Sequence, residues 1–226
     1  MKKTRSTIML VIILLLTMSS ALAAEGGDPY EVVSQTYTQD NIEIAYPQII
    51  NLSDYAIQQQ INELLKNKPV KCWDEDCREL TGLTMRTTYE IRWQSANLLT
   101  VQYRSYRYMK GAAHPVNIFD TINIDINKGR EIRLQDIVTI DEEFIALLKA
   151  GEFKAVSPKV KEIVKFSDKE MIRELNEQGV FYVTPVSLAV KVTVPHVAGD
   201  FVIFAVKFQD IAGKIKGEHP VWRELL

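Results

Sequence analysis

Two cysteines lie close together in the first half of the chain and enclose a short acidic segment. Cys72 and Cys77 are separated by four residues, and the sequence holds no other cysteine. In an oxidising compartment two such cysteines are expected to form a disulfide, which would act as a local staple. The enclosed segment reads Trp73, Asp74, Glu75 and Asp76. A pinned loop with one large aromatic side chain and three carboxylates predicts a contact surface for a cationic partner. The alternative is a solvated acidic turn whose tryptophan packs into the core.

Histidine is the second residue type that could do chemistry here. His114 stands in the stretch Gly111-Ala112-Ala113-His114-Pro115, where Gly111 permits a positive φ and Pro115 keeps His114 extended. A general base needs a positioned partner, and no neighbouring Ser, Cys or acid at a suggestive spacing supplies one. The alternative is a turn between strands whose imidazole bonds to backbone groups. His196, in the short segment 195–200, is a further candidate for ligand binding.

Two tyrosines form the third candidate site. Tyr106 and Tyr108 alternate along one segment and are flanked by Arg104 and Arg107. Such side chains can form a platform that stacks sugar rings or contacts a protein partner. Tyrosine is also common on ordinary half-buried strands, so a purely structural role is the alternative.

Motifs for catalysis and cofactor binding do not occur in the sequence. It contains no nucleophile elbow, zincin helix, phosphate loop or redox Cys-x-x-Cys. The three histidines stand at no recognisable zinc-ligand spacing, and the segment 72–77 lacks the alternating oxygen ligands and central glycine of a calcium loop. We therefore expect no metal and no cofactor, and a protein that is not an enzyme.

The N-terminus has the three-part layout of a secretory signal. Three basic residues precede the apolar stretch 8–16, and small residues follow it at 19–24. The apolar run is shorter than the roughly 20 residues that span a bilayer, which predicts a cleaved signal peptide over 1–23 and no stable membrane insertion. Retention as an anchor is the alternative. The sequence thus predicts a secreted module over 24–226, in the periplasm or at the cell exterior.

Charge and composition limit the possible partners. The formal net charge is −2, from 27 basic and 29 acidic residues. Residues 1–23 hold three basic residues and no acidic one, so 24 basic and 29 acidic residues remain after cleavage, a net charge of −5. A mildly acidic protein is a poor nucleic-acid binder and attracts cations, although the same charge can serve solubility alone.

Hydrophobic periodicity predicts an α+β fold, with antiparallel meander sheets packed against about three to four helices and a possible sub-boundary near 110–140. Alternating residues predict strands over 32–37, 42–46, 85–93, 98–109, 118–126, 186–194 and 201–208, and one that begins at 132–134. Pro47 is expected to end the first hairpin. On 98–109 the face that carries Gln102, Arg104, Tyr106 and Tyr108 is expected to be exposed.

Helices are predicted from periodicity, caps and proline. One begins behind Ser53 or Asp54 and ends near Asn67, because Pro69 follows. Others begin behind Asp141, at 157–158 and behind Ser167. The polar tail after 214 carries Trp222 as a possible docking residue.

The stretch 111–115 and the order of the elements resemble a known family. It is the family of bacterial extracellular domains of unknown function found in lysozyme-sensing anti-sigma factors and ahead of some polysaccharide deacetylase domains. The matching pieces are Tyr46-Pro47-Gln48-Ile49, Ile61-Asn62, 111–115, Ile124-Asp125-Ile126, Leu134–Val138 and Phe181–Pro185. The resemblance implies a mixed α+β module that recognises a lysozyme or a wall-associated ligand, with His114 fixing a connection beside the binding surface.

Some features of that family are not matched. Seven residues precede Ile8 and the sequence runs to Leu226, so we expect neither a sigma-binding segment nor a deacetylase domain. The segment 195–200 is shorter than the tyrosine-bearing loop of the lysozyme-recognising relatives. We expect a non-catalytic cell-envelope binding module for a cationic protein such as a lysozyme. The alternatives are a wall-glycan (peptidoglycan) binding domain and a hydrolase that uses His114.

Overall fold

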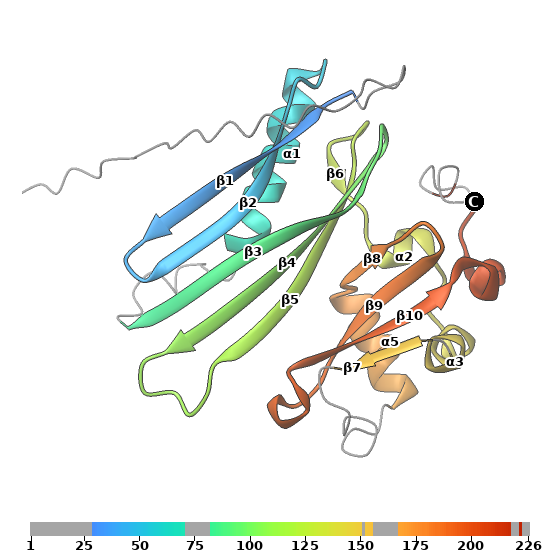
Figure 1. Ribbon diagram of the computed structural model, residues 1–226. Helices are drawn as coiled ribbons and strands as arrows, with labels where there is room; N and C mark the ends of the chain where they lie inside the picture. Colours follow the sequence, from blue (N-terminus) through green and yellow to red (C-terminus); the bar gives the residue numbers. More distant parts are fainter. Residues whose placement is uncertain (1–28, 71–81, 151, 156–166, 218–221, 223–226) are drawn as a thin grey trace, which may run out of the picture.

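Two β-sheets and the helices that cover them make up the protein (Figure 1). The computed structural model describes residues 29–70, 82–150, 152–155, 167–217 and 222. The first sheet has the order β1-β2-β3-β4-β5-β6 and the second the order β7-β10-β9-β8. The first comprises β1 (Glu31–Gln39), β2 (Ile42–Ile50), β3 (Leu83–Gln94), β4 (Leu98–Met109), β5 (Val116–Asp125) and β6 (Arg130–Glu131), with α1 (Tyr55–Val70). The second comprises β7 (Glu152–Ala155), β8 (Phe181–Val183), β9 (Ser187–Thr193) and β10 (Phe201–Lys207), with α2 (Leu134–Ile137), α3 (Glu142–Ala150) and α5 (Asp168–Glu177).

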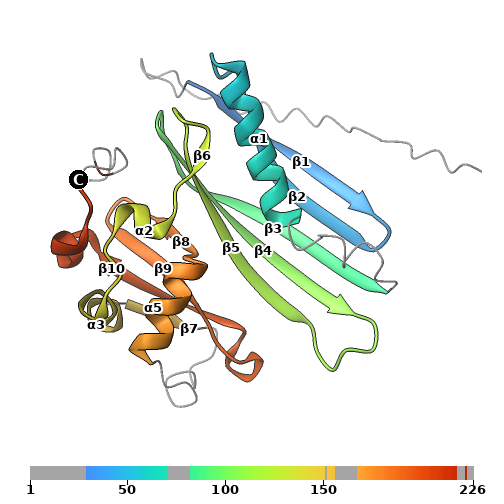
Figure 2. The same cartoon turned by 180° about the vertical axis from the view of Figure 1, so that it is seen from behind.

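The α+β class predicted from periodicity is confirmed, and the strand pairs are mostly antiparallel. The exception is the pair β2 and β3, which run parallel over Ile42–Ile44 and Met85–Thr87. Helix α1 connects these two strands and crosses one face of the sheet (Figure 2). A parallel pair needs such a crossover, because a tight turn can join only antiparallel neighbours.

The prediction that Pro47 ends the first hairpin is wrong. Strand β2 continues to Ile50 and pairs with β1 along its whole length, with Pro47 opposite Ser34. Proline lacks the backbone N–H that a neighbouring strand would accept. It is tolerated at position 47 because β2 pairs with β3 only as far as Ile44, so no described strand bonds to β2 on that side at Pro47.

Asn62 of α1 replaces the absent strand partner of β2. The Ile49 N–H donates to Asn62 Oδ1 at 2.7 Å, and Asn62 Nδ2 donates to the Ile49 carbonyl at 2.9 Å. Asn62 is buried, and Ile49 is fully buried in the core beside Ile61 of the same helix. One side chain thereby satisfies two backbone groups that would otherwise be buried without partners.

Helix α1 begins as predicted and ends later than predicted. Asp54 Oδ1 accepts the N–H groups of Ala56 and Ile57 at 2.9 and 3.1 Å, as an N-cap does. Pro69 lies inside the helix, where it removes the N–H that would bond to the Leu65 carbonyl. The hydroxyl of Tyr103 donates to that carbonyl at 2.8 Å and restores the lost bond.

The strand predicted to begin at 132–134 is also a misassignment. Strand β6 ends at Glu131, and Leu134 begins the short helix α2. The Asp136 carboxylate accepts the N–H of Arg133 at 3.0 Å, which turns the chain into the helix. Leu134 and Ile137 are then buried together at helical spacing.

In the second sheet and its helices, the predicted helix caps and the predicted central strand are confirmed. Asp141 Oδ1 accepts the Phe144 N–H at 2.9 Å before α3, and Ser167 accepts the Glu170 N–H at 3.5 Å before α5. Strand β10 lies between β7 and β9, as its apolar faces predict. Trp222 is buried in the core and donates to the Ile137 carbonyl at 3.0 Å. The helix start predicted at 157–158 lies outside the described residues.

The two sheets are joined by buried polar side chains as well as by apolar ones. Thr121 and Asn123 project from β5 and both donate to the Phe181 carbonyl of β8, at 2.5 and 2.9 Å. The Phe181 N–H donates back to Thr121 Oγ1, and the Thr100 hydroxyl donates to Asn123. Within the described residues, no helix combines the length and the apolar character needed to cross a membrane.

Candidate binding site at the hairpin ends

The acidic segment predicted as a contact surface is not among the described residues. Cys72, Cys77 and the four residues Trp73, Asp74, Glu75 and Asp76 all lie outside the described residues. The disulfide therefore stays a prediction. The described candidates are the tyrosines and the two histidines.

Tyr106 lies in a row of exposed polar side chains that crosses three strands. The register places Arg86 of β3 and Asn117 of β5 opposite Tyr106 of β4, on either side. Side chains directly opposite one another project from the same face, with Cβ atoms roughly 5 Å apart. Tyr106 is 42 % exposed, and Arg86 and Asn117 are exposed as well. Tyr108 projects from the same face one row nearer the β4–β5 turn and is half-buried.

The prediction that this whole face is exposed holds only for the end near the turn. Gln102 is 2 % exposed because the second sheet covers the other end, where Thr121 lies opposite Gln102. Arg104 marks the border. Its guanidinium carbon lies 5.6 Å above the ring of Phe119, which packs against Phe201 of β10 at a centroid distance of 5.2 Å.

The β4–β5 turn meets the β9–β10 turn through the two predicted histidines. Both turns lie at the lower end of the molecule in Figure 1. The rings of His114 and His196 stack with centroids 3.6 Å apart and planes inclined by 3°. Gly111 has a φ of +91° in the first turn, as the sequence predicts for that glycine. The structure thus unites two histidines that are far apart in the sequence.

Asp200 ties the two turns together. Its Oδ2 accepts the backbone N–H of Asn117 at 3.0 Å and the side-chain amide of Asn117 at 3.1 Å. Its Oδ1 lies 2.8 Å from Nδ1 of His196. Because Asn117 is also the neighbour of Tyr106, the tyrosine row and the stacked imidazoles form one continuous surface. We call this the hairpin-end surface, made of Arg86, Arg104, Tyr106, His114, Asn117 and His196.

The hydrogen bonds of the imidazoles define which ring nitrogens a ligand can reach. His114 Nδ1 lies 3.0 Å from the Pro115 carbonyl, which can only accept, and His196 Nδ1 faces a carboxylate. Both Nδ1 atoms therefore carry the hydrogen, and each Nε2 of a neutral ring is an acceptor. Among the described residues nothing bonds to either Nε2. If His114 acted as a general base, a carboxylate would have to orient its ring. The carboxylate at this site, Asp200, binds His196 instead.

The Asp200 carboxylate should make stability depend on pH. Burial acts to raise the pKa of Asp200, but the hydrogen bonds from Asn117 and His196 outweigh it and hold the pKa below the ordinary carboxyl value. A carboxyl whose pKa is lower in the folded state stabilises above its unfolded pKa of about 3.9, and this contribution is lost as the pH falls through the folded pKa.

The variant Asp200→Asn tests this dependence. Asparagine tolerates the φ of +73° at this position but lacks the charge that strengthens the three bonds. We expect the free energy of unfolding to fall by about 1 kcal/mol at neutral pH, with the difference from the wild type shrinking below about pH 4. Urea unfolding at several pH values measures both quantities. A difference that stays constant with pH would assign the loss to packing instead.

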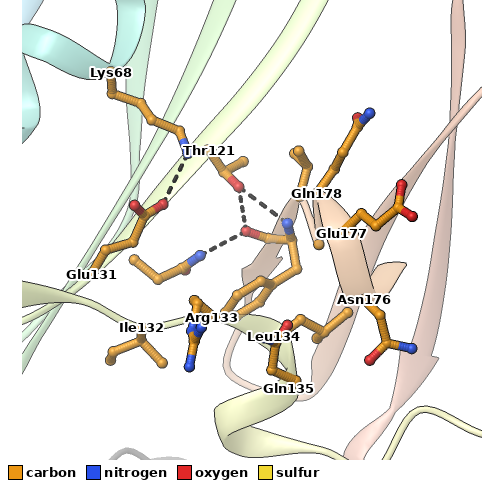
Figure 3. Close-up of a pocket in the computed structure, with 14 residues that line it drawn as sticks. Lys68, Thr121, Glu131, Ile132, Arg133, Leu134, Gln135, Asn176, Glu177 and Gln178 are labelled. Atoms are coloured by element: carbon orange, nitrogen blue, oxygen red, sulfur yellow. Dashed lines mark hydrogen bonds and ion pairs between the residues drawn. The ribbon is translucent and has the colours of Figure 1, made fainter. Parts of the chain in front are cut away.

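A polar cavity of about 210 Å³ lies apart from this surface, between the end of α1 and the end of α5 (Figure 3). Lys68 enters it from α1 and contacts Glu131 at 2.9 Å and Asp120 at 3.6 Å. Burial acts to lower the pKa of Lys68, but the two carboxylates together raise it. Burial raises the pKa of Asp120 despite the attraction of Lys68. The cavity has room for several water molecules, and neither histidine lines it.

Sequence reasoning missed three members of this site. Arg86 was only a polar position within the predicted strand 85–93, Asn117 preceded the predicted strand 118–126, and Asp200 was only the end of the segment 195–200. The sequence signal that could have predicted the role of Asp200 is its position four residues after His196, with a glycine between them. That glycine, Gly199, has a φ of +106°. Such a turn can bring an imidazole and a carboxylate together. No described cluster of three or more His, Cys, Asp or Glu side chains is arranged to hold a metal ion.

Comparison with known proteins identifies the fold. No protein-family model and no curated protein matches the sequence. A member of the DUF3298 family from Bacteroides fragilis NCTC 9343 is similar in structure, with a TM-score of 0.60 and 14% identity over 89% of this chain and 99% of that chain. A DUF3298 family protein from Pseudomonas aeruginosa PAO1 gives a TM-score of 0.50 and 12% identity, over 85% of this chain and 96% of that chain.

These likenesses agree with the resemblance to bacterial domains of unknown function that the sequence suggested. The association with anti-sigma factors and deacetylases stays a prediction. At this level of identity the likeness concerns the fold alone. The chain therefore shares the fold of the DUF3298 proteins, a bacterial domain family of unknown function.

Proposed function

We propose that this protein is a secreted, non-catalytic binding module of the bacterial cell envelope, and that its hairpin-end surface recognises a wall glycan. The observation that carries the proposal is the continuity of an exposed tyrosine with two stacked imidazoles across two hairpins. The signal peptide predicted over 1–23 supports export, and residues 24–226 are then the working protein.

The chemistry of the surface suits a sugar ring. An aromatic face stacks on the C–H groups of a sugar, and Tyr106 offers both a ring and a hydroxyl. The Nε2 atoms of His114 and His196 and the oxygen of the Asn117 amide can bind sugar hydroxyls. Asp200 fixes the positions of Asn117 and His196, and His114 stacks on His196, so little side-chain freedom is lost when a ligand binds.

Recognition of a cationic protein such as a lysozyme is the second candidate. It depends on the acidic segment 73–76 and the net charge of −5, and it remains a prediction from the sequence. The hairpin-end surface does not favour it, because Arg86 and Arg104 would repel a cationic partner. If a lysozyme binds, we expect the affinity to fall steeply with added salt.

Loss of Tyr106 should abolish most glycan binding. With Tyr106→Ala, we expect retention on purified wall sacculi to fall at least tenfold, because aromatic anchors dominate such surfaces. Binding is measured by co-sedimentation of the processed protein. The matched control is Tyr55→Ala, since Tyr55 is 70 % exposed at the start of α1, away from this surface.

Equal retention of both tyrosine variants and the wild type would contradict the role of the hairpin-end surface. Wild-type protein that does not sediment with sacculi at all would contradict glycan recognition itself. Release of soluble sugar or peptide fragments from the sacculi, lost in the His114→Ala variant, would contradict the non-catalytic assignment.

A further inference from the structure

We propose that Arg86 and Arg104 form an anion clamp beside Tyr106, so that the preferred ligand is a glycan that carries carboxylate or phosphate groups. The inference rests on the proposed function and names the class of glycan that this same surface selects.

The strand register fixes the two guanidinium groups around the tyrosine. Arg86 is the direct cross-strand neighbour of Tyr106, and Arg104 precedes Tyr106 by two residues on the same face of β4. Direct neighbours lie roughly 5 Å apart and positions two residues apart roughly 7 Å. A sugar ring stacked on Tyr106 would therefore present its substituents to an arginine on two sides.

Arg104 is held in place before any ligand arrives. Its guanidinium lies over the Phe119 ring, and Phe119 is 2 % exposed and packed between Phe201 and Tyr182. A cation–π contact uses no N–H group as a hydrogen-bond donor to a carboxylate or carbonyl, so the N–H groups of Arg104 stay available for an acceptor. Tyr182 in turn lies under the guanidinium of Arg92, so two neighbouring aromatic rings each carry a guanidinium here.

Neither Arg86 nor Arg104 is neutralised within the described part of the chain. Both side chains are exposed, and neither forms a salt bridge, in contrast to Arg92, which pairs with Glu90 at 2.7 Å. Two carboxylates lie on this side. Glu43 of β2 is opposite Arg86 in the strand register but forms no salt bridge with it among the described residues, and Asp200 has both oxygens engaged by Asn117 and His196. The clamp therefore offers two forked donors to an anion, in a protein whose overall charge is negative.

The anionic group could come from two parts of a cell wall. Carboxylates belong to the peptidoglycan itself, and phosphates belong to wall polymers attached to it. Guanidinium forks bind both in the same bidentate manner, so the ligands for the test must separate them.

The test measures binding of the processed protein to four soluble probes by titration calorimetry. They are a neutral oligomer of N-acetylglucosamine, muropeptides, polygalacturonate and a polyglycerol phosphate. We expect the anionic probes to bind at least tenfold more tightly than the neutral oligomer. In the double variant Arg86→Ala and Arg104→Ala this preference should vanish, because the affinity for the anionic probes falls to that for the neutral oligomer. The variants Arg86→Lys and Arg104→Lys should restore part of it, since lysine keeps the charge but not the fork.

The matched control is Arg173→Ala, since Arg173 is an exposed arginine of α5 without a salt bridge among the described residues. Equal binding of anionic and neutral probes by the wild type would overturn the clamp and leave glycan recognition intact. An anion preference that survives the double variant would also overturn it. If no probe binds, the proposed function fails. NMR titration with inorganic phosphate then tests the clamp by itself. A shift of the Arg86 and Arg104 Nε–H resonances would support the clamp, and the absence of a shift would overturn it as well.

Discussion

Replacing Asn62 by alanine is expected to lower the free energy of unfolding by about 3 kcal/mol. The change leaves both the N–H and the carbonyl of Ile49 without partners in a fully buried position, because β3 no longer pairs with β2 there. Each unpaired buried backbone group costs about 1–3 kcal/mol. For a protein of this size such a loss lowers the melting temperature by roughly 6–12 °C.

Urea unfolding followed by circular dichroism measures this loss. Asn67→Ala is the control, because Asn67 is an exposed asparagine of the same helix and its replacement should change stability by less than about 0.5 kcal/mol. If the two variants unfold at the same urea concentration, Asn62 does not substitute for a strand partner.

Replacing Asn123 by alanine should be the second strongly destabilising change, with a loss of about 2–3 kcal/mol. Asn123 donates to the Phe181 carbonyl and accepts from Thr100, and all three residues are buried where the two sheets meet. Removing the amide leaves the Thr100 hydroxyl without its acceptor and weakens the connection between β5 and β8. Thermal unfolding of Asn123→Ala and of the wild type gives the difference.

A double-mutant cycle separates this network from simple packing. Thr121 and Asn123 donate to the same Phe181 carbonyl, so the variants Thr121→Val and Asn123→Ala should not be additive, with an interaction energy of about 1 kcal/mol. Additive losses would mean that the two side chains stabilise the sheets independently.

The parts of the fold that the sequence predicted correctly are those set by local chemistry. Asp54, Asp141 and Ser167 each begin a helix, because a cap needs only the N–H groups two or three residues ahead. The β3–β4 hairpin follows from alternation over adjacent segments and a short turn. These features depend on little beyond their own neighbourhood.

The wrong predictions concern residues whose partners are far away in the sequence. Pro47 is compatible with β2 because β3 diverges from β2 before that point. Pro69 is compatible with α1 because Tyr103 of β4 donates a hydrogen bond to the carbonyl that the proline leaves unpaired. Neither fact is visible from local propensity, which treats proline as a stop. Leu134 continued an alternating pattern, but Asp136 turned the chain into a helix.

The candidate site was predictable in its residues but not in its assembly. Alternation along β4 assigned Tyr106 to a polar face, but it could not tell which part of that face the second sheet covers. His114 and His196 were separate candidates in the sequence, and only the packing of the two sheets stacks them. Asp200 was missed because its role depends on Asn117, which belongs to the other hairpin.

Titration of the isotope-labelled, processed protein with muropeptides, followed by two-dimensional NMR, tests the central claim most directly. We predict that the largest shifts fall on the backbone amides of Tyr106, Asn117 and His196 and on the imidazole signals of His114 and His196. Shifts confined to the cavity around Lys68, or shifts nowhere in the spectrum at millimolar ligand, would contradict recognition of a wall glycan at the hairpin ends.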